Sequence, residues 1–140
     1  MRVLMSFLLA LAGLFCGCAS EQLKAGHGDV GQFILRQAVS YGGNPTVTNG
    51  LPIISERWRY SEDINGVVIF MSRNDYSSVE SFLTQAFGKP QFGPKDTSDG
   101  GRMGEYRLTS KGGGIQFSHD DNDTEVVIIR PLGQGSQHLF

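Results

Sequence analysis

The sequence predicts an α+β domain in which a mostly antiparallel sheet of about five strands carries one or two helices on one face. Two segments have apolar residues at helical spacing, and five others are short apolar or alternating runs. Short turns join several of these runs, and strands joined in that way must lie antiparallel. The expected order is helix, strand, strand, helix and then three strands.

The first predicted helix begins after Asp29, which can cap it, and is stopped by the turn-forming residues Gly42 to Pro45. Its apolar residues recur at spacings of three and four: Val30, Phe33, Ile34, Ala38 and Tyr41. Gly31 and two further apolar residues, Leu35 and Val39, leave a strand open as an alternative for this segment.

The next two predicted elements are strands, Ile53 to Tyr60 and Val67 to Met71, connected through Asn65-Gly66. The Asn-Gly pair favours a type I′ hairpin turn, because both central residues of that turn need positive φ. The uninterrupted apolar run from Val67 to Met71 indicates a central strand that is buried on both faces.

The second predicted helix, Tyr76 to Phe87, has the clearest pattern in the chain. Its apolar positions all fit one helical face: Val79, Phe82, Leu83, Ala86 and Phe87. Ser77 to Glu80 matches the capping box, with Asn74 or Asp75 as alternative caps one turn earlier. Gly88 suits the left-handed position that follows a helix.

A long polar segment, Lys89 to Met103, separates this helix from the last strands and is predicted to be a mobile loop. Loops of this length tend to be either functional or disordered. Three strands are then expected, at Glu105 to Thr109, Ile115 to His119 and Glu125 to Pro131. The residues from Gly133 to Phe140 are expected to form a loose tail.

The first residues have the parts of a secretory signal: the positive Arg2, the apolar run Val3 to Phe15, and small residues after it. Gly17-Cys18 at the end of this signal resembles the lipobox of bacterial lipoproteins. The resemblance implies that residues 1–17 are removed and that Cys18 is acylated. Two alternatives are an ordinary secretory signal cut after Ala19 and an uncleaved anchor, although a span needs ~20 apolar residues.

If the signal is a lipoprotein signal, the chain has four parts: a signal peptide (1–17), a lipidated tether (18–28), one α+β domain (29–133) and the tail (134–140). A tri-acylated Cys18, as in that family, would hold the domain on a membrane permanently. Ala19 in the second mature position favours an outer membrane facing the periplasm, where the source has one. Cys16 and Cys18 are the only cysteines, so the mature domain has no disulfide.

Composition argues against several classes of function. The formal net charge is −2 and lysine and arginine do not cluster along the chain. This pattern is poor for binding nucleic acid, and it lacks the polybasic segment that holds an anionic lipid surface. No cofactor is expected.

The acidic segment Asp120 to Glu125 is the only candidate for a metal site, since Asp121, Asp123 and Glu125 alternate as calcium ligands do. It lacks the glycine and the distant bidentate glutamate of a calcium loop. A solvated hairpin turn is the favoured interpretation, because Asp and Asn bond their own backbone in turns. No spacing of histidines offers a zinc site.

The stretch most typical of a binding surface is Arg57-Trp58-Arg59-Tyr60. On a strand, Trp58 and Tyr60 share one face and the two arginines share the other. Exposed aromatic residues beside arginine make good recognition surfaces. The alternative, which the pattern favours, places Trp58 in the core and the arginines on the solvated face.

Two hypotheses for function follow. The first is a non-catalytic binding or interaction domain in the cell envelope, attached to the membrane through Cys18 and meeting an envelope protein partner. The second is a small anchored hydrolase that uses His119 with Asp120 or Glu125 as an acid/base pair. No Gly-x-Ser-x-Gly or phosphate-binding glycine motif supports catalysis. A pocket lined by His119 and two acids would favour the hydrolase.

Overall fold

The computed structural model describes residues 23–47 and 53–133 of the chain. Cys18, with the whole predicted signal, and the predicted tail 134–140 lie outside the described residues. No helix among the residues described is both long and apolar enough to cross a membrane.

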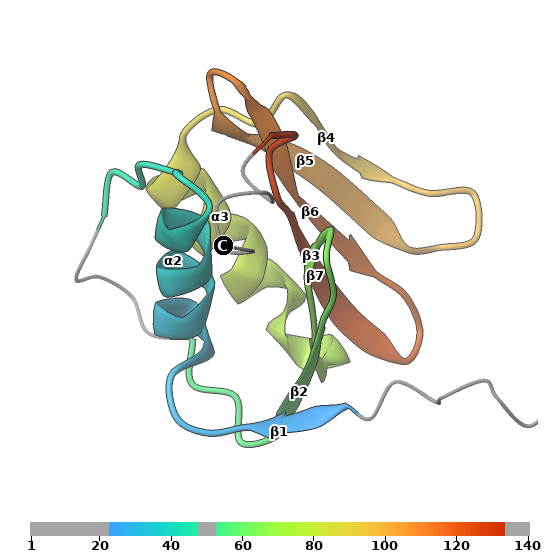
Figure 1. Cartoon of the computed structure of the whole chain (residues 1–140). Coiled ribbons are helices and arrows are strands. Elements are labelled where there is room, and N and C mark those ends of the chain that lie inside the picture. Colours follow the sequence, from blue (N-terminus) through green and yellow to red (C-terminus); the bar gives the residue numbers. More distant parts are fainter. Residues whose placement is uncertain (1–22, 48–52, 134–140) are drawn as a thin grey trace, which may run out of the picture.

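The described residues form one seven-stranded antiparallel sheet in the order β1-β2-β3-β7-β6-β5-β4. Two helices, α2 (Val30–Ser40) and α3 (Tyr76–Phe87), lie on one side of it (Figure 1). A short 3₁₀ turn, η1 (Arg73–Asp75), leads into α3. The strands are β1 (Lys24–Gly26), β2 (Trp58–Glu62), β3 (Gly66–Ser72), β4 (Phe92–Asp96), β5 (Arg102–Thr109), β6 (Gly112–His119) and β7 (Asp123–Ile129).

The prediction of an α+β fold with an antiparallel sheet and helices on one face is confirmed, but the sheet has seven strands instead of about five. Both additional strands are edges. β1 lies within the predicted tether and pairs with β2, so the sheet begins before Asp29. β4 lies within the predicted loop Lys89 to Met103 and pairs with β5. Edge strands bury little, so their sequences carry little apolar pattern.

The predicted type I′ turn at Asn65-Gly66 is wrong. Gly66 belongs to β3, and the turn is made by Asp63, whose carboxylate accepts the N–H groups of Asn65 and Gly66 at 2.6 and 2.9 Å. Glycine at position 66 serves close packing instead, because a Cβ there would lie 2.0 Å from the carbonyl oxygen of Ile128 on β7.

The two helices follow the sequence pattern, with one difference at a cap. Asp29 caps α2 as predicted, accepting the N–H of Gln32 at 3.1 Å. The capping box at Ser77 does not form, because η1 runs directly into α3 and Asp75 is the cap residue without a side-chain bond. Gly88 ends α3 with φ of +78°, as predicted.

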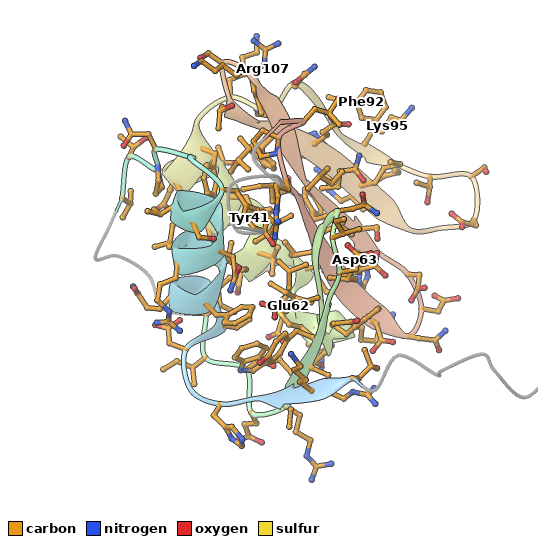
Figure 2. All side chains as sticks on the ribbon, viewed as in Figure 1. Tyr41, Glu62, Asp63, Phe92, Lys95 and Arg107 are labelled. Carbon is orange, nitrogen blue, oxygen red and sulfur yellow. The ribbon has the colours of Figure 1, made fainter. Side chains whose placement is uncertain are left out.

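The core lies between the helices and the sheet. The apolar face of α3 is buried, and Leu83 and Val79 have no exposed surface. On β5, the hydroxyl of Tyr106 meets that of Thr84 on α3 at 2.8 Å. In Figure 2 the side chain of Tyr41, also buried, lies between α2 and the sheet.

An ion-pair network attaches α3 to the strands at the β4 edge. Arg102 on β5 donates to both carboxylate oxygens of Glu80 on α3, at 2.8 and 3.0 Å. It also donates to Asp96 on β4 at 3.0 Å. The bonds to Glu80 have the largest effect on the guanidinium group, followed by the bond to Asp96, and both raise its pKa, so Arg102 stays charged. The network therefore gives the residues of the predicted loop a defined position.

Candidate functional site

The aromatic half of the predicted binding stretch belongs to the core. Trp58 is only 4% exposed, and its indole N–H donates to the carbonyl oxygen of Gly28 at 3.1 Å. Its ring and that of Tyr60 each lie 4.8 Å from the ring of Phe33 on α2. Trp58 and Tyr60 therefore hold α2 against the start of the sheet.

The two arginines lie in a groove of about 640 Å³. Both are exposed. The groove forms where β1 and β3 end and β2 and β7 begin, so it joins segments far apart in the sequence. Its lining residues are Ala25, Gly26, His27, Glu56, Arg57, Trp58, Arg59, Phe70, Met71, Ser72 and Asp123.

The strand register shows which face of the sheet the groove occupies. Arg59 pairs directly with Ala25 on one side and with Phe70 on the other, so these three side chains project to the same face. The alternate residue Tyr60 is on the opposite face, packed against α2. The groove therefore opens on the face that no described helix covers (Figure 1).

The guanidinium groups of Arg57 and Arg59 are available for a ligand. Among the residues that the structure describes, ion pairs link Lys24 to Glu62 and Arg102 to Glu80 and Asp96, and neither groove arginine takes part in one. Neither guanidinium donates a hydrogen bond to another described residue. Arginine suits this role, since its planar fork matches carboxylate and phosphate oxygens.

Acidic groups line the same groove, so its charge is mixed. Glu56 precedes Arg57 in the chain, and Asp123 begins β7 directly opposite Ser72 on β3. Between them lies the half-buried Phe70, which projects to the groove, whereas the buried side chain of the neighbouring Met71 projects to the core. The arrangement can hold a group of each charge on either side of an apolar patch.

A second hollow of about 350 Å³ adjoins the groove, and the two share Glu56, Arg57 and Ser72. Asp75, the cap residue of α3, also lines this hollow. One carboxylate oxygen of Asp75 is buried without a hydrogen-bond partner among the described residues. Arg57 therefore stands between two connected depressions.

The predicted acid/base residues do not converge. His119 does not line the groove; its ring stacks on Tyr76 at 4.5 Å, and its Nδ1 lies 3.5 Å from the hydroxyl of buried Thr124. Glu125 is in register with Phe70 and projects to the uncovered face of the sheet, whereas His119 pairs with Thr124 and projects to the helix-covered face. Burial, and then the charges of Asp120 and Asp123, raise the pKa of Glu125.

The carboxylate of Asp120 has a structural role. It accepts the N–H groups of Asn122 and Asp123 at 2.6 and 2.9 Å, as in the solvated turn that the sequence favoured. These bonds lower the pKa of Asp120. In the described ranges, no group of three or more His, Cys, Asp or Glu side chains is placed to hold a metal ion.

The predicted binding stretch supplied Arg57, Trp58 and Arg59 of the groove lining but not the residues from the other segments. His27 was assigned to the tether, and Phe70 to a strand buried on both faces. The predicted burial on both faces is wrong, because from Val67 to Met71 only every second residue is fully buried, an alternation that the uninterrupted apolar sequence does not show. Ser72 and Asp123 join the groove through the pairing of β3 with β7, which sequence spacing does not show.

Comparisons of the chain with protein-family models, with curated proteins and with solved structures find no match.

Proposed function

We propose that this chain is a membrane-anchored lipoprotein of a bacterial cell envelope, whose domain binds a charged partner or ligand in the groove without catalysing a reaction. The observation that carries the binding role is the pair of exposed arginines, Arg57 and Arg59, without a carboxylate partner among the described residues. Charge-assisted bonds from arginine are among the stronger polar contacts in proteins.

The anchoring role rests on Gly17-Cys18, which resembles a lipobox, and on the apolar run before it. Acyl chains on Cys18 make the membrane the first partner of the chain. Ala19 favours an outer membrane facing the periplasm, and an envelope protein is the expected kind of macromolecular partner.

The anchor is tested by feeding cells a clickable fatty acid and comparing two cysteine variants. Cys18→Ser should abolish labelling of the chain, whereas Cys16→Ser should leave it, because cleavage removes position 16. Equal labelling of wild type and Cys18→Ser would show that the anchor assignment is wrong.

The binding role is tested by photo-crosslinking in intact cells. A photoreactive phenylalanine analogue at Phe70, on the floor of the groove, should form an adduct that disappears when Arg57 and Arg59 are changed to Gln. The matched control places the analogue at Val39, which is exposed on α2 outside the groove. Absence of an adduct at position 70, or the same adduct from both positions, would contradict the proposed site.

A further inference from the structure

We infer that the groove holds the headgroup of a zwitterionic phospholipid of the phosphoethanolamine class, in the membrane that carries the anchor. This inference rests on the proposed acylation of Cys18. It names the ligand of the groove, and it follows from the charges of the groove, its apolar floor and its distance from the anchor.

The charges of the groove match a ligand that carries both signs. Arg57 and Arg59 offer donors for a phosphate at the β2 side, whereas Asp123 offers acceptors for an ammonium at the β7 side. β3 lies between these strands, so their backbones are about 10 Å apart at the usual strand spacing. Long arginine side chains reach into that interval, which leaves room for a short headgroup.

The floor of the groove suits the part of a lipid that follows the headgroup. Phe70 is half-buried and Ala25 is exposed, and both project to the uncovered face in register with Arg59. Apolar surface beside a phosphate site favours a ligand that continues into glycerol and acyl carbons. A free inorganic ion would leave this surface uncovered.

The groove is close to the membrane because the chain between them is short. β1 begins at Lys24, six positions after Cys18. A fully extended chain covers at most ~3.5 Å per residue, so Lys24 is within about 20 Å of the acylated cysteine. Gly26 and His27, which line the groove, follow directly. Lipid headgroups are therefore the ligands at highest local concentration.

The mixed charge also distinguishes between lipid classes. The phosphate of an anionic headgroup would bind the arginines. Such a headgroup has no cationic group to pair with the carboxylates of Glu56 and Asp123. Like charges brought together in this way lower affinity and give specificity. We therefore expect phosphatidylethanolamine to bind more tightly than phosphatidylglycerol.

Isothermal titration calorimetry supplies a direct readout of binding. The heat of binding is used because the one tryptophan, Trp58, is buried against α2 on the opposite side of the sheet. The full chain, in micelles of an uncharged maltoside detergent, is titrated separately with short-chain phosphatidylethanolamine, short-chain phosphatidylglycerol, free phosphoethanolamine and inorganic phosphate.

The expected result is a saturable heat of binding with phosphatidylethanolamine, at an affinity at least about tenfold above that of the other three probes. Changing both Arg57 and Arg59 to Gln should weaken this binding at least about tenfold, and Asp123→Asn should remove the preference over phosphatidylglycerol. Arg107→Gln, an exposed arginine at the other edge of the uncovered face, should change nothing. Unchanged thermal midpoints show that the variants fold.

Three results would overturn the inference. Equal binding of phosphate and phosphatidylethanolamine would reduce the groove to an anion site, and equal binding of free phosphoethanolamine would make a soluble ligand its occupant. No saturable binding of any probe would show that the groove holds neither a phospholipid nor a free phosphate or phosphoethanolamine. The proposed function is tested separately, by the labelling of Cys18 and by the adduct at Phe70. A failure of the lipid inference can therefore be distinguished from a failure of the proposed function.

Discussion

Gly26 shows how one missing side chain positions the groove. Its strand partner is Trp58, and a Cβ at position 26 would lie 2.2 Å from atoms of the indole ring. The bare backbone of β1 therefore lets the indole pass beneath it and reach Gly28. Any side chain here must displace either the ring or the strand.

We therefore expect Gly26→Ala to lower the free energy of unfolding by about 1–3 kcal/mol, the usual cost of overpacking. Denaturant unfolding followed by Trp58 fluorescence measures this loss. Gly114→Ala is the matched control in β6, because the nearest atom to its added Cβ, the carbonyl oxygen of Tyr106, is 3.6 Å away. Equal losses at the two positions would mean that the indole does not pack under β1 as described.

Glu125 gives a second residue-scale prediction, in the pH dependence of stability. Burial raises its pKa above the ordinary value of 4.5, so the folded state keeps this proton to higher pH than the unfolded state does. Stability from this group is therefore present at low pH and is lost as pH rises through the folded pKa. Glu125→Gln should raise the thermal midpoint at neutral pH and leave it unchanged at about pH 4.

Asp120 is the internal control, because its shift has the opposite sign. Backbone N–H groups lower its pKa below 3.8, so its contribution is present above that value and is lost as pH falls through the folded pKa. Asp120→Asn should lower the thermal midpoint at neutral pH. If both variants moved the midpoint in the same direction, the assigned environments would be wrong.

At the scale of elements, α3 carries the most testable packing. Leu83 is fully buried on the face toward the sheet, and Ser81 is exposed. Leu83→Ala should lower the free energy of unfolding by about 2–5 kcal/mol, the range for a truncated core leucine. Ser81→Ala, on the exposed face of the same helix, should change the free energy of unfolding by less than about 0.5 kcal/mol. A loss at Leu83 as small as that at Ser81 would refute the assigned helix face.

The elements that bury a full face were predictable from the sequence, and those at the edges were not. The stripe around Leu83 repeats an apolar residue at the helical period, and the uninterrupted apolar run Val67 to Met71 is typical of a central strand. β4 has no such repeat, and its one large apolar residue, Phe92, is exposed. The ammonium of Lys95 lies 4.4 Å from the centre of the Phe92 ring, and the two side chains are neighbours in Figure 2. The pairing of β4 depends on β5, which local sequence does not reveal.

The candidate site was predictable only in part for a similar reason. Arg57 and Arg59 could be selected from the local sequence, because arginine and aromatic residues are both enriched in recognition surfaces. Their partners in the groove come from β1, β3 and β7 and meet them through strand register. Register is set by the whole sheet, so no local pattern brings Asp123 to the arginines.

At the scale of the whole molecule, the sheet should differ in stability from its centre to its edges. β1 and β4 each have one strand neighbour, the five inner strands have two, and β3, β7 and β6 are the three farthest from the edges. Native-state amide exchange should therefore be slowest in β3, β7 and β6, approaching the global free energy of unfolding, and fastest in β1 and β4. Exchange in β4 as slow as in β7 would contradict this order.

The position of β7 has a consequence for how the chain folds. β7 is the last strand in the described sequence, yet it occupies the middle of the sheet between β3 and β6. Until it is in place, β1–β2–β3 and β4–β5–β6 are two half-sheets with open inner edges. Pairings between residues so distant in sequence form slowly, and open edges invite association with other chains. A chain in which β7 has not yet paired therefore presents two open strand edges to which other chains can add.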